Sequence, residues 1–330
     1  MRTHRASASS TTVSLAIAAV LLALALALAA CGGSGATAST SPTAAPGEAG
    51  LPATASPSAP PLPKGAGRGT IAFTKVTEDS PDIYVVRSDG TGLRRMAEYA
   101  RRPTWSPDGS QIAYVRHGGG GVWVMKADGS GQHRVTPALA EVYGFTWSPD
   151  GTQIVLSHAD DLAIVNTDGS GLEFVPTGSA RVMGFSPAWA PDGRIFFGGG
   201  SRDLGAICSV RPDGSGLTNI TAAPTRSSFS LSHDGTWLAV WDGDADRLLR
   251  LLGSGRGTAV PIVFDVSQYV GTGAPVPSSW SPDGRMIAFG NDSGAWLVPG
   301  TSLYVAKTDG SEVWEVPNTE DGYDPAWRPQ

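Results

Sequence analysis

The stretch "TWSPDGSQIAY", residues 104–114, returns three more times along the chain. The further copies are "TWSPDGTQIVL" at 146, "AWAPDGRIFF" at 188 and "SWSPDGRMIAF" at 279. With two degenerate copies included, the motif places Trp at 105, 147, 189, 280 and 327, and Leu at 231. The spacings between these positions are 42, 42, 42, 49 and 47 residues. A repeat of roughly 40 residues indicates an array of supersecondary units.

A second motif, of the type "DGSG", alternates with the first and begins at 88, 127, 167, 212 and 308. Pro pre-sets φ in "SPDG", Asp caps the turn, and Gly accepts positive φ. Asp-Gly between two apolar runs is typical of a tight β-hairpin. Each repeat therefore contains four strands, such as "QIAYV" and "VWVMK" around the first turns. Four antiparallel strands per repeat are the composition of a propeller blade.

Second strands of the repeat begin near 71, 112, 154, 194, 237 and 286, which predicts six blades. The repeat array starts with "GTIAFTK" at 69, which lacks a first strand, and ends with "GYDPAWRP", which is a first strand alone. We expect an all-β, six-bladed β-propeller over 69–330 in which the C-terminal strand completes the first blade. Each repeated Trp is expected to pack between neighbouring blades.

The two motifs resemble those of a known family. "WSPDGxxIAF" followed by "LYVxxxDGS" is similar to the repeats of TolB-type six-bladed propellers, which are related to the propeller of prolyl oligopeptidases. The resemblance covers residues 69–330 and implies an envelope protein. We expect two departures from the family: a tether in place of the N-terminal small domain of TolB, and no hydrolase domain after Gln330.

The N-terminal segment has the pattern of an export signal. Positive charge in "MRTHR" precedes an apolar run over 13–30, and "LAAC" at 28–31 resembles the lipobox of bacterial lipoproteins. By that resemblance residues 1–30 are a signal peptide and Cys31 carries lipid. A permanent transmembrane anchor is the alternative, since the run is nearly long enough to span a bilayer. Residues 31–68 are rich in Ala, Ser, Pro and Gly, which predicts a disordered tether.

Charge and cysteine content limit the classes of partner. The chain has a net charge of −6, so it has no electrostatic reason to bind nucleic acid. Its second cysteine, Cys208, lies in the strand-like "AICSV" and is expected to be a buried apolar residue.

The sequence contains no complete motif for catalysis or metal binding. Asp242, Asp244 and Asp246 begin like a calcium loop, but the later ligand positions do not match, so a solvated acidic loop is expected. The histidines are dispersed and lack zinc-like spacing. At the inner-strand positions three and four residues before the repeated Trp, Asp324 is the one carboxylate, which argues against a calcium-dependent channel enzyme. We therefore predict no catalytic residue, cofactor or metal.

Binding is then expected on the propeller face with variable loops. The longer repeat spacings place insertions at 265–275 and 290–301, and these carry Tyr269, Trp296 and Leu297 as candidate contact residues. A second candidate group, near the channel mouth, consists of Arg101, Arg102, Tyr143 and Tyr323.

The sequence thus predicts a non-catalytic, membrane-anchored lipoprotein of the cell envelope, outside the cytoplasm. Its expected partner is an envelope protein or a peptidoglycan-associated component. Two alternatives stay open: a carbohydrate-active or peptide-processing propeller enzyme, and a sensor of a small ligand. An enzyme would need convergent polar groups at the channel mouth, whereas a binder would need an exposed apolar patch with a polar rim.

Overall fold

The computed structural model describes residues 69–77, 80–116, 120–137, 139, 142–178, 180–182, 187–201, 204–220, 229–241, 248–253, 262–265, 274–292 and 302–329. All of them belong to one compact unit, 57–330. Every regular element described is a β-strand. Within these residues no helix is long and apolar enough to cross a membrane.

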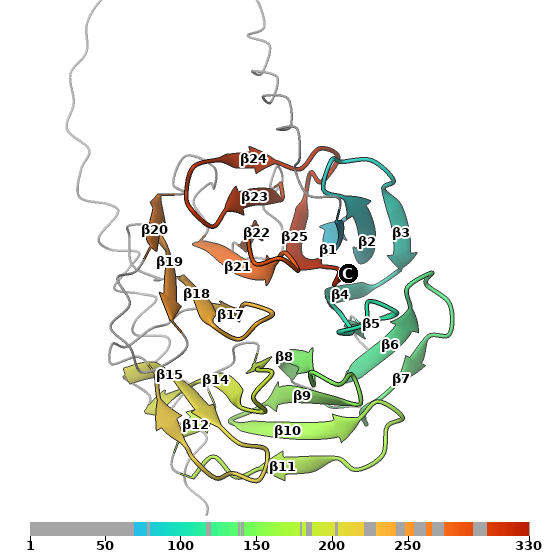
Figure 1. Cartoon of the computed structure of the whole chain (residues 1–330). Helices are drawn as coiled ribbons and strands as arrows, with labels where there is room; N and C mark the ends of the chain where they lie inside the picture. The colour runs from blue at the N-terminus through green and yellow to red at the C-terminus, as the bar shows by residue number, and fades with distance from the viewer. Residues whose placement is uncertain are drawn as a thin grey trace, which may run out of the picture. The chain divides into compact units, whose positions relative to one another are not determined.

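The described strands form six antiparallel sheets, arranged around a ring (Figure 1). We number them as blades in chain order. Blade 1 contains β25 (Gly322–Trp327), β1 (Thr70–Val76), β2 (Pro81–Arg87) and β3 (Arg94–Ala97), and blade 2 contains β4 (Ala100–Trp105), β5 (Gln111–Arg116), β6 (Val122–Lys126) and β7 (His133–Arg134). Blade 3 contains β8 (Val142–Trp147), β9 (Gln153–His158), β10 (Asp161–Asn166) and β11 (Glu173–Val175).

The second half of the ring follows the same order. Blade 4 contains β12 (Arg181–Val182), β13 (Ala188–Trp189), β14 (Ile195–Ser201), β15 (Leu204–Val210) and β16 (Thr218–Asn219). Blade 5 contains β17 (Phe229–Leu231), β18 (Trp237–Trp241), β19 (Leu248–Gly253) and β20 (Ile262–Asp265), and blade 6 contains β21 (Ala274–Trp280), β22 (Met286–Asp292), β23 (Tyr304–Lys307) and β24 (Val313–Glu315).

The expected all-β propeller and its ring closure are confirmed. Strand β25 pairs antiparallel with β1, with Trp327 opposite Ile71, so the last strand supplies the inner strand of blade 1. Blade 4 departs from the expected four strands, because β12 and β13 each pair with a different part of β14. Its inner edge is thus formed by two short strands separated by residues 183–187, of which 183–186 lie outside the described residues.

The hydrophobic core lies between blades. Six clusters of buried residues occur in the described part of the chain, and each draws on two neighbouring blades. The repeated Trp residues enter these clusters, as expected: Trp147, 4 % exposed, also donates its indole Nε1–H to the Thr104 carbonyl of blade 2 at 3.2 Å. Trp280 makes the same bond to Ser230 of blade 5 at 3.3 Å. The repeated Trp therefore joins neighbouring blades by packing, and Trp147 and Trp280 add a hydrogen bond to the preceding blade.

The Ser-Pro-Asp-Gly turns share one hydrogen-bond pattern, seen clearly in 148–153. The Ser148 hydroxyl donates to Asp150 Oδ1 at 2.6 Å and accepts the Gln153 N–H at 2.9 Å. Asp150 also accepts the Thr152 N–H at 3.0 Å, and Gly151, with φ 72°, donates its N–H to the Ser148 carbonyl. Each of the four motif residues thus has a structural task, which explains the repetition.

The two faces of the ring differ in their connections. Because neighbouring strands are antiparallel, the Ser-Pro-Asp-Gly and Asp-Gly-Ser-Gly turns all lie on one face, which we call the turn face. The opposite loop face carries the loops between second and third strands and the connections between blades. The chain enters β1 at Gly69, on the turn face.

Candidate functional site

The structure brings the predicted channel-mouth residues together on the loop face. Arg101 and Arg102 lie on β4, Tyr143 on β8 and Tyr323 on β25. Strand β4 contacts both β25 and β8, so these are three consecutive inner strands. Arg102 spans the gap between two blades, because its Nη1 donates a hydrogen bond to the backbone oxygen of Tyr143.

Near the loop face, irregular pairing of the inner strands interrupts the regular alternation of their side chains. The register of β4 shifts between Arg101 and Thr104, and that of β8 shifts between Val142 and Gly144. The pairing of β25 with β1 shifts in the same place, between Ala72 and Thr74 of β1. Bulges of this kind re-aim side chains and are frequent beside binding and catalytic sites.

Tyr99, which the sequence analysis missed, is the most exposed aromatic residue of this region. Its side chain is 52 % exposed, and its backbone is left-handed, with φ 51°. This conformation is uncommon for a residue with a bulky side chain. It is held by a hydrogen bond of 3.0 Å from the Tyr99 N–H to Asp82 Oδ1.

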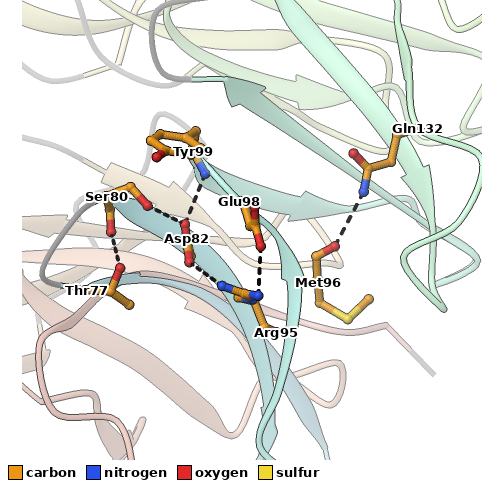
Figure 2. Close-up of polar contacts among 8 residues, drawn as sticks. All are labelled: Thr77, Ser80, Asp82, Arg95, Met96, Glu98, Tyr99 and Gln132. Atoms are coloured by element: carbon orange, nitrogen blue, oxygen red, sulfur yellow. Dashed lines mark hydrogen bonds and ion pairs between the residues drawn. The ribbon is translucent and has the colours of Figure 1, made fainter.

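Asp82 is built to hold this connection (Figure 2). The residue is 2 % exposed and accepts a hydrogen bond of 2.7 Å from the Ser80 hydroxyl. Arg95 lies 3.4 Å from its second carboxylate oxygen and 2.7 Å from Glu98, so one guanidinium bridges both carboxylates. Ser80, Asp82 and Arg95 belong to blade 1, and Tyr99 lies where the chain leaves that blade.

The backbone of Arg102 is held in the same manner as that of Tyr99. Its φ is 55°, and its N–H donates a hydrogen bond of 3.0 Å to the hydroxyl of Thr74, which is fully buried in β1. Two residues with large polar side chains, Tyr99 and Arg102, thus have left-handed backbones. Each is fixed by a buried side-chain oxygen of blade 1.

Backbone strain concentrates on this face. In the described part of the chain the non-glycine residues with positive φ are Tyr99, Arg102, Ala159, Asn318, Asp321 and Asp324. All six lie in loop-face connections or at the loop-face ends of inner strands. Strained residues persist where the surroundings over-determine them, and they cluster at functional sites. We call Tyr99, Arg101, Arg102, Tyr143 and Tyr323 the tyrosine–arginine arc.

The composition of the arc suits recognition of another molecule. Tyr99 and Tyr143 are 52 % and 38 % exposed, while Arg101 and Arg102 are half-buried. Tyr and Arg are the residue types that most often anchor protein interfaces. Guanidinium groups on a fixed backbone bind carboxylates with little loss of freedom.

Among the described residues, the titratable groups with shifted pKa values serve the fold. A hydrogen bond from the Ser106 hydroxyl lowers the pKa of Asp108 to about 2. The hydroxyl of Ser148 likewise lowers the pKa of Asp150, in the corresponding turn of blade 3. Burial raises the pKa of the Cys208 thiol, which is 2 % exposed and lies in β15, as expected. These groups stabilise turns and core and do not converge on a site.

Several sequence candidates cannot be placed. Tyr269, Trp296 and Leu297, the Asp242–Asp246 loop and Cys31 lie outside the described residues. Among the residues that are described, no three His, Cys, Asp or Glu side chains gather closely enough to hold a metal ion.

The six-sheet ring, with its shared turns and C-terminal closure, defines a β-propeller. A family model described as the TolB beta propeller domain matches residues 56–237, more than half of the chain, and the protein belongs to that family. No curated protein sequence matches the chain.

Solved structures with the same fold include a TolB and an enzyme. TolB from Acinetobacter baumannii is 16 % identical, with a TM-score of 0.66, over 80 % of this chain and 68 % of that one. A TolB candidate from Agrobacterium tumefaciens is 15 % identical, with a TM-score of 0.57, over 78 % and 91 %. Oligogalacturonate lyase from Vibrio parahaemolyticus is 16 % identical, with a TM-score of 0.51, over 76 % and 74 %. At these identities the likeness is one of fold, and the fold serves more than one activity.

Proposed function

We propose that the protein is a non-catalytic binding module of the cell envelope, whose propeller binds another envelope protein or a cell-wall-associated component. Membership of the TolB propeller family supports the envelope location that the sequence resemblance implies. The observation that carries the binding role is the preset backbone of Tyr99 and Arg102, the residues that bear an exposed phenol and a half-buried guanidinium. Rigid anchors of this kind lower the entropic cost of association.

In this proposal the chain is a lipoprotein, held to the membrane through lipid on Cys31. The attachment side supports the arrangement, because the chain enters the propeller at Gly69 on the turn face and leaves the tyrosine–arginine arc on the opposite face. A flexible tether over 31–68 then permits the loop face to meet a partner. Metabolic labelling with a radioactive fatty acid should label the native chain and not the Cys31→Ser variant. Absence of label on the native chain would rule out the lipid anchor.

The binding role is tested by affinity capture from detergent-solubilised envelopes with the full chain as bait. The test variant combines Tyr99→Ala and Arg102→Gln. The matched control combines Phe174→Ala and Arg134→Gln, which alter the same types of group at exposed sites on β11 and β7. We expect a protein or cell-wall fragment that the native chain and the control retain and the test variant loses. Equal retention by all three chains, or no retention, would contradict the proposal.

A further inference from the structure

The turn aspartates are engaged in their own turns, and Cys208 lies next to Asn219 with no other reactive group among its described contacts. The loop-face residues Tyr99 and Arg102 differ from these groups, because two buried side chains of blade 1 set their backbones.

We infer that the tyrosine–arginine arc recognises a peptide segment that presents a carboxylate next to an aromatic side chain. This inference rests on the proposed function and specifies the chemistry of the partner. Arg102 is the centre of the site: it lies between the inner strands that carry Tyr323 and Tyr143, and three residues from Tyr99.

The guanidinium of Arg102 has N–H donors that its contacts with the described residues do not use. It has five N–H donors, and among the described residues the contact found for them is the bond from Nη1 to the Tyr143 oxygen. That bond links the group to the neighbouring blade, across the boundary between blades 2 and 3. A planar guanidinium with donors to spare binds a carboxylate in a bidentate manner.

The exposed tyrosines specify what should accompany the carboxylate. Tyr99 and Tyr143 present phenol rings that are 52 % and 38 % exposed, and such rings favour aromatic neighbours by 0.5–1.5 kcal/mol in typical pairs, about a two- to tenfold gain in affinity. Arginine and aromatic groups could also suit a nucleic acid. The net charge of −6 opposes a polyphosphate, whereas a short acidic segment needs only the local guanidinium.

The fixed backbone makes Thr74 a positioning residue of the site. Its side chain is fully buried, so a partner cannot touch it, yet its hydroxyl accepts the Arg102 N–H. Thr74→Val keeps the shape of the side chain and removes this acceptor. Thr74→Ser keeps the hydroxyl. If Thr74→Val weakens binding and Thr74→Ser does not, the hydroxyl acts by positioning Arg102, and general damage to the propeller is excluded as the cause.

The probe is a fluorescent random copolymer of glutamate and tyrosine, and its binding to the full chain is followed by fluorescence polarisation. A glutamate homopolymer and a lysine–tyrosine copolymer are the comparison probes. We expect the glutamate–tyrosine copolymer to bind more tightly than either. Because the protein is itself acidic, bulk attraction to a polyanion does not produce this order.

Arg102→Gln should weaken binding of the glutamate–tyrosine copolymer by about 10- to 100-fold, the usual range for a lost hydrogen bond to a charged group. Arg102→Lys should recover only part of the loss, and Thr74→Val should weaken binding by about tenfold while Thr74→Ser does not. Thermal melting shows whether the buried variant Thr74→Val is folded. If it is not, the surface variant Arg102→Gln still tests the inference. Arg134→Gln is the matched surface control and should bind as the native chain does.

Three results would overturn the inference: no binding of the glutamate–tyrosine copolymer, equal binding of the lysine–tyrosine copolymer, or unchanged binding by Arg102→Gln. If envelope capture succeeds and depends on Tyr99 and Arg102 while the copolymer test fails, the proposed function stands and the partner chemistry is wrong. If the copolymer binds through Arg102 but nothing is captured from envelopes, the partner chemistry stands and the proposed function is wrong.

Discussion

Removal of the Asp82 carboxylate should destabilise the propeller and loosen Tyr99 together. Asp82 accepts hydrogen bonds from the Ser80 hydroxyl at 2.7 Å and the Tyr99 N–H at 3.0 Å, and it lies 3.4 Å from a guanidinium nitrogen of Arg95. A hydrogen bond to a charged acceptor contributes roughly 1.5–3 kcal/mol. The long ion pair to Arg95, whose side chain is 51 % exposed, contributes about 0–1 kcal/mol.

The freed donors lie near the surface and regain bonds to water, so the full sum is not lost. We expect Asp82→Ala to lower the free energy of unfolding by about 2–4 kcal/mol. For a domain of this size that corresponds to a fall in Tm of roughly 4–10 °C. Asp82→Asn keeps an oxygen for the Tyr99 N–H and should cost about half as much.

The measurement is thermal unfolding of the full chain, followed by near-ultraviolet circular dichroism, with Asp160→Ala as the control. Asp160 forms an exposed ion pair with Arg181, on the same face of the propeller, and its loss should shift Tm by less than about 2 °C. An equal shift for Asp82→Ala and Asp160→Ala would refute the assignment of Asp82 as the buried support of the connection. Asp82→Ala should also weaken envelope capture, because Tyr99 loses its fixed backbone.

Three further predictions concern the repeated architecture. Gly214 and Gly193 have nearly the same φ, 82° and 83°, but a Cβ at 214 would lie 2.7 Å from the Pro176 oxygen of blade 3, whereas one at 193 meets nothing within 4 Å. In chemical denaturation, Gly214→Ala should therefore lower the free energy of unfolding by about 1–3 kcal/mol more than Gly193→Ala does. Equal losses would refute the close contact between the blades. Trp147→Phe removes the bond to the Thr104 carbonyl and leaves a small void, so the same assay should show a loss of about 1–3 kcal/mol. Hydrogen bonds from turn hydroxyls hold the pKa of Asp108 and of several other turn aspartates below the ordinary value of 3.8. The stabilisation that these carboxylates give the folded state is therefore complete above about pH 4 and is lost as pH falls toward about 2. Tm should be lower at pH 3 than at pH 5, and a higher Tm at pH 3 would contradict this pH dependence.

The architecture was predictable because each part of the repeat acts locally. Ser148, Asp150 and Gly151 satisfy one another within six residues, and Trp147 reaches the preceding blade from a constant position in the repeat. Such patterns are visible in a single sequence. The pairing of β25 with β1 followed from counting strands, since a first strand was missing at one end of the array and present at the other.

The candidate site was only half predictable. Repeat position brought out Arg101, Arg102, Tyr143 and Tyr323, which the structure places on consecutive inner strands. Tyr99 was missed because its importance comes from Asp82, 17 residues away on a different strand.

Two other features were out of reach of the sequence pattern. The link from Thr74 to Arg102 spans 28 residues and two blades, and no repeat position marks it. The split inner edge of blade 4 was also unforeseen, because residues 181–189 keep the motif spacing while pairing with β14 in two places.

Site-specific photo-cross-linking in cells tests the central claim most directly, that the loop face around Tyr99 binds a partner. A photoreactive phenylalanine analogue is placed at position 99, at position 143, or at position 174, where Phe174 is 57 % exposed on the outer strand β11. The proposal predicts one discrete adduct from positions 99 and 143 and none from position 174. An adduct from position 174 alone, or from none of the three, would contradict it.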